Sequence, residues 1–418
     1  MRVLFLVADS LRADALGCYG SDLRTPTVDQ LASGGARFET VISSAPWTLP
    51  SLGAMLTGVW SHRLGLMKWE QPWPRGVPTL FDAFRRKGIE TASFVFEPDH
   101  LFSACPEASV AGSSQDTDAM LAWFRARRHG DYFAFVHYWW THVPYVRRRL
   151  ALATWNQVCR QLLALLSAPD PATRLANRLQ IQGLYAVAVQ EFSEVWLPPL
   201  LEAARADTVV LVSDHGESWG ERLSATDTLD DVFDLHGNHL HEEVLRVPWI
   251  LHSPGLVPAV TVSGLARSVD VLPTLLEVLA LDHPSLRAPS GASHARSGRS
   301  LAAALGTGQL AGEHVAFSSR NHDFLDAPAL PSEPSSVYAE FACRSLYRKV
   351  LMDVRGAHAR EYDLRADPAE TSSIRLPDDS PSALAAALRS ELPHAVVSPH
   401  HAEDSARMGQ RLKDLGYL

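Results

Sequence analysis

The stretch that decides the fold spans residues 207–217 and reads DTVVLVSDHGE. Its run of β-branched and aliphatic residues predicts a buried strand, which stops at Asp214 and His215. In open α/β sheets, ligands bind beyond the carboxyl ends of the strands, so polar side chains at that point are candidates for chemistry. The simpler alternative is that Asp-His-Gly forms only a turn.

A second segment of the same kind opens the chain. The apolar run RVLFLVA at residues 2–8 is followed at once by Asp9, which predicts another buried strand with a carboxylate at its end. Carboxylate and imidazole groups together suit a divalent cation. We therefore predict that Asp9, Asp214 and His215 hold a metal ion, although Asp9 alone could also be a helix N-cap.

The rest of the first half alternates between two patterns. Helix-like spacing at residues 79–87 and 118–130 is followed by strand-like runs at 89–96 and 131–140, and a long amphipathic stretch covers 177–206. This alternation predicts a doubly wound, mostly parallel α/β sheet with helices on both faces.

Beyond this region the composition changes. Pro, Ser, Gly and Ala dominate residues 282–308, which indicates a surface connection. We place a catalytic domain at residues 1–300 and a smaller C-terminal α+β subdomain at 301–418. The subdomain is expected to hold a small antiparallel sheet, with a hairpin at 337–354, and a terminal helix at 406–418.

The overall composition restricts the class of protein. The 418 residues are 46% hydrophobic and 20% charged, with a formal net charge of −9, which is typical of a globular protein and unfavourable for a nucleic-acid partner. No apolar run is long enough to span a membrane, and the first residues lack the pattern of a signal peptide. The four cysteines are widely spaced, so we expect reduced thiols and a cytoplasmic location. The oligomeric state is not indicated.

A third segment, APWTLPSLGAMLTG at residues 45–58, holds a candidate nucleophile. Pro50 fits the first turn of a helix, which places Thr48 just before the N-terminus, where an anion is favoured. A threonine hydroxyl attacks only when it is activated, and coordination to the predicted cation would activate it. Thr48 is therefore a candidate nucleophile and metal ligand, with a simple N-cap as the alternative.

Several segments together resemble the sulfatase family of the alkaline phosphatase superfamily, in the same order as in that family. They are VADSLRADALGCYG, TLPSLGAMLTG, THVPY, SDHGE, HGNHLHEEVLRVPWILHSPG and DVLPTLLEVL. The resemblance implies an alkaline phosphatase-like fold and hydrolysis or transfer of sulfate or phosphate esters at a metal-bound nucleophile. It also implies that Asp9, Asp214 and His215 are metal ligands and that Thr48 stands where the nucleophile stands.

The same resemblance suggests roles for four histidines. His142 and His236 match positions that contact the ester or protonate its leaving group, a task that suits imidazole near neutral pH. His62 and His239 are assigned to substrate binding. By local sequence alone, His142 and His236 could equally be structural hydrogen-bond donors, and His239 could belong to an exposed helix start.

The nucleophile segment departs from the sulfatase pattern. Sulfatases oxidise a cysteine or serine within C/S-x-P-S-R to formylglycine, whereas here Thr48 begins the motif and Leu52 replaces the arginine. Oxidised threonine would be a ketone, so we expect no formylglycine. A register beginning at Ser44 ends at Thr48 where arginine belongs, and is discounted.

These departures favour a phosphate mono- or diester as the substrate, with hydrolysis or transfer through Thr48. One alternative is a sulfate, sulfamate or phosphonate ester, again a small molecule. Another, from a different class, is a catalytically silent relative that binds an anion, because Ser10 and Leu52 occupy altered positions.

One divalent ion, Zn²⁺, Mn²⁺, Ca²⁺ or Mg²⁺, is expected. Ser10 stands where many sulfatases carry a second aspartate, so the first site has fewer carboxylates than in those enzymes. A second ion remains open if Glu217 reaches His142, His236 and His239.

Overall fold

The computed structural model describes most of the chain. The described residues are 1–66, 76–96, 110–146, 152–166, 168, 170–221, 236–237, 239–281, 296–321, 339–353, 358–377 and 379–394. Among them, no helix is both long and apolar enough to cross a membrane.

The centre of the large sheet is β1 (Arg2–Ala8), which runs parallel to β5 (Tyr132–Tyr138) and β6 (Thr208–Val212). All three strands are buried along almost their whole length, as their apolar sequences predict. Val7 of β1 is level with His137 on one side and Val212 on the other. This register brings the residues after β1 and β6 to the same edge of the sheet.

Further strands extend the sheet on both sides, in the order β4-β3-β5-β1-β6-β8-β2-β7, with β9 paired to β2. Their bounds are β2 (Ala36–Ile42), β3 (Glu90–Val95), β4 (Val110–Ser113), β7 (Arg246–Val247), β8 (Trp249–His252) and β9 (Val260–Arg267). Five of the pairings are parallel and three are antiparallel. The predicted mostly parallel sheet is confirmed.

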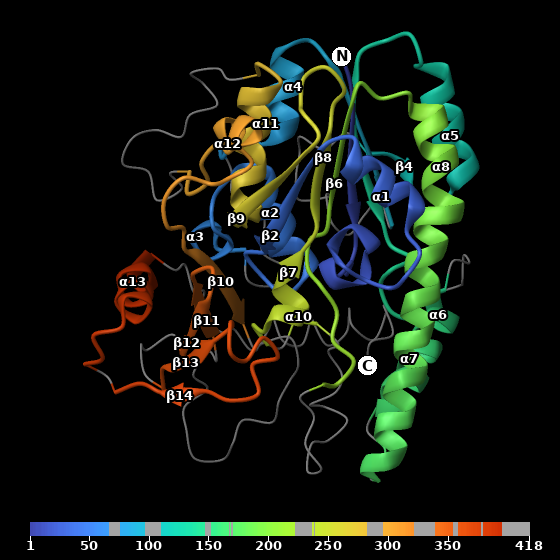
Figure 1. Cartoon of the computed structure of the whole chain (residues 1–418). Helices are drawn as coiled ribbons and strands as arrows, with labels where there is room; N and C mark the ends of the chain where they lie inside the picture. The colour runs from blue at the N-terminus through green and yellow to red at the C-terminus, as the bar shows by residue number, and fades with distance from the viewer. Residues whose placement is uncertain are drawn as a thin grey trace.

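Helices cover both faces of this sheet (Figure 1). One group consists of α2 (Thr48–Thr57), α4 (Leu80–Arg86), α11 (Val271–Val278) and α12 (Ala302–Thr307). The other contains α1 (Pro26–Ser33), α5 (Thr117–Ala126), α6 (Leu152–Leu166), α7 (Pro171–Glu191) and α8 (Leu197–Ala204). The predicted amphipathic stretch 177–206 thus divides into α7 and α8, which a π-helical turn at Phe192–Trp196 joins.

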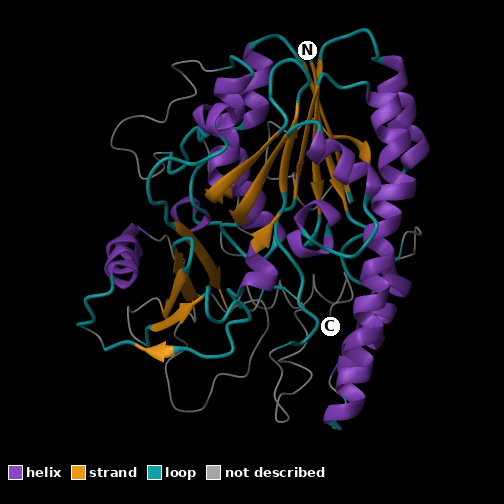
Figure 2. Ribbon diagram, in the orientation of Figure 1, coloured by secondary structure: helices purple, strands orange, loops and turns teal. Residues whose placement is uncertain are grey.

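A separate antiparallel sheet forms the C-terminal subdomain, on the side of the large sheet where β1 ends (Figure 2). Its strands are β10 (Ala316–Asn321), β11 (Ala339–Arg344), β12 (Arg348–Asp353), β13 (Arg360–Asp363) and β14 (Ile374–Arg375). The helix α13 (Ala383–Glu391) packs against β11 and β12. The predicted hairpin at 337–354 corresponds to β11 and β12, while the predicted terminal helix at 406–418 lies outside the described residues.

The division at residue 300 stays a prediction. In the structure, Leu301 and Leu305 belong to the core of the large domain, so α12 packs with the large sheet, and the small sheet begins only at Ala316. The helix α12 packs with the large domain, although it follows residue 300, because it is apolar on the face that meets β9 and α11.

Candidate active site

Two carboxylates and an imidazole meet at the carboxyl edge of the large sheet. Asp9 follows β1 directly, and Asp214 and His215 follow β6 after one intervening serine. All three side chains are fully buried, and their ligand atoms lie within 4.8 Å of one another. Nε2 of His215 is 3.5 Å from Oδ2 of Asp214 and 3.6 Å from Oδ1 of Asp9. The structure therefore brings together the three residues predicted to hold a metal.

Thr48 joins this cluster from the first turn of α2. Its Oγ1 lies 3.3 Å from both Oδ2 of Asp9 and Nε2 of His215. Trp47, in extended conformation, occupies the N-cap position and makes no side-chain capping bond. The helix thus begins at Thr48, slightly earlier than expected, and the Thr48 hydroxyl faces the cluster instead of capping the helix.

The structure adds His137, a residue that the sequence reasoning missed. It lies in β5, is fully buried, and places Nε2 2.9 Å from Oδ2 of Asp9 and 3.9 Å from Oδ2 of Asp214. The available signal was a polar residue in the otherwise aromatic and aliphatic run YFAFVHY. Its significance appears only when β5 is aligned beside β1.

Burial and mutual charge shift the pKa values of the cluster in opposite directions. Burial and the neighbouring charge of Asp9 raise the pKa of Asp214. Burial would also raise the pKa of Asp9, but His137, His142 and His215 hold it well below its usual range. Burial alone would lower the pKa of His215, yet the two aspartates raise it. The charge state of each group in the cluster therefore depends on its neighbours.

The donor set fits a divalent cation. Oδ2 of Asp214 is buried and accepts no hydrogen bond from the residues that the structure describes. Such an oxygen is costly unless a partner satisfies it. Two carboxylates, an imidazole and a hydroxyl are ligands for zinc, manganese or a comparable ion. A bound ion would polarise an ester oxygen and lower the pKa of a coordinated hydroxyl.

Comparison with known proteins identifies the family. Residues 2–281 match the family model described as Sulfatase. The chain belongs to the sulfatase family. Among curated sulfatases, an ulvan-active sulfatase from Formosa agariphila is 22% identical over 322 residues, which cover 66% of this chain and 60% of that protein. Human arylsulfatase D is 46% identical over 65 residues, or 15% of this chain and 11% of that protein. The match thus spans less than two thirds of either relative.

Solved structures of a sulfatase and of a phosphonate monoester hydrolase share the fold. A 2-O GAG sulfatase superimposes with a TM-score of 0.66 at 16% identity, covering 99% of this chain and 92% of its own. The phosphonate monoester hydrolase of Agrobacterium radiobacter gives a TM-score of 0.65 at 18% identity, covering 98% and 95%. The predicted alkaline phosphatase-like architecture with a smaller antiparallel subdomain is confirmed.

Two of the predicted histidines lie beside the cluster of this sulfatase-family protein. The ring of His236 lies 4.4 Å from that of His215 and 4.8 Å from that of His142, between centroids. Nδ1 of His142 lies 2.6 Å from the Val143 carbonyl oxygen, which can only accept, so Nδ1 carries the proton. Burial lowers the pKa of His142 to about 4 and that of His236 to about 3, so both rings are neutral at pH 7.

Glu217 orients one of these rings. Its Oε1 lies 2.9 Å from Nδ1 of His236, and its Oε2 accepts a hydrogen bond of 3.0 Å from the Tyr145 hydroxyl. Burial raises the pKa of Glu217 to about 7. When ionised, Glu217 accepts from the Nδ1 proton of His236 and leaves Nε2 as an acceptor.

The other two histidines have different neighbours. Nε2 of His239 lies 4.0 Å from Oε1 of Glu243, in α10 (Glu242–Leu245). His62, in α3 (Ser61–Leu64), is fully buried, and its Nε2 lies 2.9 Å from Oε1 of Glu391 in α13. The substrate-binding roles of His62 and His239 stay predictions. The observed partner of His62 belongs to the C-terminal subdomain, because the turn after α2 carries the chain toward that sheet.

A second ion would need Glu217 to share a site with His142, His236 and His239. Glu217 contacts His236, as expected for a shared site, whereas His239 lies with Glu243. Among the described residues, Asp9, Asp214 and His215 form a group of His, Asp, Glu or Cys side chains whose ligand atoms lie close enough to share one ion. That group supports one site.

The departures from the sulfatase motif have structural consequences. Leu52, which stands in place of the motif's arginine, belongs to α2, and its side chain is buried in the main core. Ser10, with a positive φ of 56°, donates from Oγ to Oδ1 of Asp9 at 2.8 Å and from its backbone N–H to Oδ1 of Asp214 at 3.3 Å. Ser44 instead bonds Ser61 at 2.9 Å, so Thr48 is the hydroxyl that faces the cluster.

Proposed function

We propose that this sulfatase-family protein is a metal-dependent hydrolase or transferase of phosphate mono- or diesters, with Thr48 as the nucleophile. The observation that carries the proposal is the position of the Thr48 hydroxyl, 3.3 Å from both Asp9 and His215 at the start of α2. Threonine lacks the side-chain chemistry of formylglycine, but its hydroxyl can attack phosphorus directly.

The proposed reaction has two steps. Oγ1 of Thr48 attacks phosphorus, and the bond to the alcohol oxygen breaks. The proton lost by Thr48 passes to a neutral imidazole, His142 or His236, and then to the departing alkoxide, so that proton transfer needs no outside acid. Water, or another acceptor, then attacks the phosphorus of the phosphothreonine, the bond from phosphorus to Oγ1 breaks, and the acceptor's proton passes through the same imidazole to Oγ1, which restores Thr48. Asp9, Asp214, His215 and Thr48 would hold the divalent ion, and the other groups orient and move protons.

A second candidate keeps the site and changes the ester to a sulfate, sulfamate or phosphonate. The similarity to a phosphonate monoester hydrolase and to an ulvan-active sulfatase favours it. Another related structure, at 18% identity, contains D-glucosamine-2-N,6-O-disulfate, a small-molecule sulfate ester. A catalytically silent, anion-binding relative is the third candidate, to be judged by whether the protein binds a divalent ion.

Substitution of the nucleophile tests the first candidate. Thr48→Ala is expected to reduce kcat for an aryl phosphate by at least about 10³-fold, as removal of a nucleophile does in other enzymes, while metal content stays similar. Brief exposure of the unaltered protein to the same ester should add a phosphate mass that maps to Thr48. Thr48→Ser, which keeps a hydroxyl, is the matched control and should retain activity.

The outcomes separate the candidates. A fully active Thr48→Ala variant contradicts the threonine mechanism. Turnover of aryl sulfate or phosphonate monoester well above that of aryl phosphate favours the second candidate. Failure to bind any supplied divalent ion favours the silent relative.

A further inference from the structure

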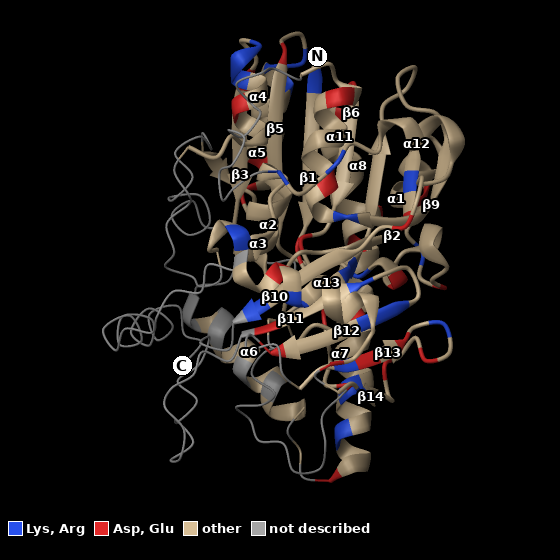
Figure 3. Ribbon diagram, turned by 90° about the vertical axis from the view of Figure 1, so that its left-hand side faces the viewer, with Lys and Arg blue, Asp and Glu red and all other residues tan. Residues whose placement is uncertain are grey.

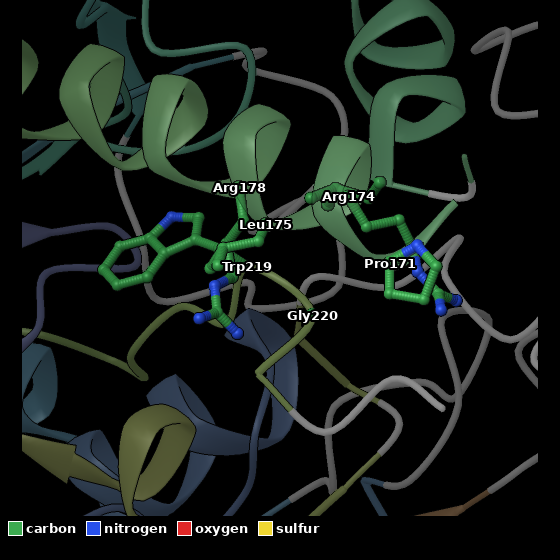
Figure 4. Close-up of a pocket in the computed structure, with 7 residues that line it drawn as sticks. Pro171, Arg174, Leu175, Arg178, Trp219 and Gly220 are labelled. Atoms are coloured by element: carbon green, nitrogen blue, oxygen red, sulfur yellow. The ribbon is translucent and has the colours of Figure 1, made fainter. Parts of the chain in front are cut away.

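A small cavity lies beside the segment that follows Asp214 and His215. It has a volume of about 130 Å³ and lies between the first turns of α7, the end of α6 and the turn at Trp219 and Gly220 (Figure 4). That turn follows Asp214 closely in the chain, so the Cα atoms of Asp214 and Gly220 cannot be more than about 22 Å apart even if the chain between them were extended. Tyr185 links this turn to the active site: its ring lies 5.0 Å from that of Trp219, and its hydroxyl donates to the Ser10 carbonyl oxygen at 3.0 Å.

Two arginines of α7 line this cavity. Arg174 and Arg178 are one helical turn apart and share a face of the helix, where like charges repel. Nε of Arg178 is buried and makes no hydrogen bond to the described residues. A buried donor on a charged group is costly to leave unpaired, and an anion in the cavity would satisfy it.

Two acids that flank the cavity, among the residues that the structure describes, already have other partners. Asp170 caps α7 by accepting from the backbone N–H and the hydroxyl of Thr173, both at 2.7 Å. Glu221 accepts from the hydroxyl of Ser218 at 3.0 Å and from the backbone N–H of Trp219 at 2.6 Å, and it pairs with Arg12 at 3.0 Å. Both carboxylates therefore already accept from donors other than Arg178.

The remaining walls are apolar. Leu166, Leu175 and the indole of Trp219 line the cavity beside the arginines. Figure 4 shows the Arg178 guanidinium close to Trp219, with Arg174 farther along the same helix. Trp219 itself is nine-tenths buried, with the guanidinium of Arg12 4.3 Å from its ring centroid and the ring of Tyr185 at 5.0 Å, so this wall is firmly held.

We propose that this cavity binds a second acidic group of the substrate, a carboxylate, sulfate or phosphate carried on an apolar or ring-shaped body. Arginine forks recognise such planar or tetrahedral anions, and the indole and leucines accept the adjoining carbon skeleton. The cavity is smaller than a typical ligand pocket of roughly 300–1,000 Å³, so it holds one end of a longer molecule. The inference rests on the proposed function, because the other end is the ester cleaved at Thr48.

Direct binding tests the cavity independently of catalysis. The probe is naphthalene-2-carboxylate, titrated by calorimetry into the metal-loaded protein, with its neutral methyl ester as the chemical control. Arg178→Gln is expected to weaken binding of the carboxylate at least about ten-fold, which corresponds to 1.4 kcal/mol. Arg86→Gln, at an exposed position in α4, is the matched control and should leave binding unchanged. Thr48→Ala should also bind the probe normally.

Turnover then tests the link to the substrate. We compare ω-carboxyalkyl phosphates of increasing chain length with plain alkyl phosphates of the same length. Above the length that spans the two sites, the carboxylate should lower KM, and Arg178→Gln should remove that advantage without changing kcat/KM for the plain esters.

The binding and turnover experiments test the cavity and the proposed function separately. Probe binding that depends on Arg178, in a protein without phosphatase activity, supports the cavity and contradicts only the proposed function. Equal binding to Arg178→Gln, equal binding of the neutral ester, or turnover with no carboxylate advantage at any length overturns the inference.

Discussion

At the scale of single residues, Asp9 is held in place by the residue that follows it and by a residue of β5. Ser10 donates to its Oδ1 at 2.8 Å, and Nε2 of His137 lies 2.9 Å from its Oδ2. Because a metal-binding carboxylate must keep a fixed orientation, such contacts contribute to affinity as well as to folding. His137 is therefore the residue outside the predicted set whose loss should most affect binding of a divalent ion at the proposed site.

His137→Gln is expected to weaken binding of a divalent ion by about 10–100-fold, the usual effect of losing a partner of a metal ligand. The measurement is competition for Zn²⁺ or Mn²⁺ against a chromophoric chelator. His129→Gln, at an exposed site before β5, is the matched control. Unchanged affinity in His137→Gln would show that this imidazole has no part in the site.

At the scale of elements, α13 is attached to the small sheet by one apolar face. Leu388 and Ala385 are fully buried and Leu384 is 9% exposed, in a cluster with residues of β11 and β12. Such a short helix is not stable alone, so these contacts hold it in the fold.

Leu388→Ala should lower the free energy of unfolding by about 2–5 kcal/mol, because it removes buried methyl groups and leaves a cavity. Urea denaturation followed by circular dichroism measures the change. Leu179→Ala, in α7, is the control: that side chain is 58% exposed, so a change within about 0.5 kcal/mol is expected. Equal effects in the two variants would mean that α13 is not packed as described.

The contact between α3 and α13 makes stability depend on pH. Burial alone would raise the pKa of Glu391, but hydrogen bonds from His62 and Arg63 lower it to about 2. An unfolded glutamate has a pKa of about 4.3, so the ionised form is favoured in the folded state. The resulting stability is present above about pH 4.3 and is lost as the pH falls toward 2.

We therefore expect Tm to fall between about pH 4.5 and 2 more steeply for the unaltered protein than for Glu391→Gln, which lacks this titrating group. Differential scanning calorimetry across this range provides the comparison. Parallel Tm profiles for the two proteins would exclude a contribution from Glu391.

At the scale of the whole molecule, buried charges join the two sheets. Lys349 of β12 is fully buried, with Nζ 2.7 Å from Oε1 of Glu370 and 3.0 Å from Oε1 of Glu242 in α10. Arg344 of β11 adds a two-pronged contact to Glu242. Figure 3 shows basic and acidic positions interspersed along β10–β13. This network holds the segment after His239 to the subdomain, since Nζ of Lys349 also donates to the Leu240 carbonyl oxygen at 3.0 Å.

Lys349→Met should destabilise the fold by about 3–5 kcal/mol, because it leaves the buried Glu370 carboxylate without its cation. The double variant Lys349→Met/Glu370→Gln, which removes both charges, should recover part of the loss. Chemical denaturation measures both, with Lys87→Met at an exposed position as the control. A double variant as unstable as the single one would contradict this account.

Much of the fold was predictable because local patterns and tertiary contacts agree. The apolar runs at residues 2–8 and 208–212 are buried parallel strands, and Thr79 caps α4 where helix-like spacing begins. Asp9 and Asp214 were recognisable because each interrupts an apolar run at a strand end. The direction of each strand and a shared sheet are enough to bring these two carboxylates to one edge.

The sequence by itself determined where the candidate chemical residues lie along the chain. Asp9, Thr48 and the Asp214–His215 pair stand at the ends of local elements, and periodicity locates those ends. Tertiary structure alone decided which side chains from distant elements meet them. His137 sits within a strand, and only its register against β1 brings it to Asp9. The arginine cavity likewise depends on how α7 lies over the turn at Trp219, because contacts between elements distant in sequence leave no periodic trace along the chain.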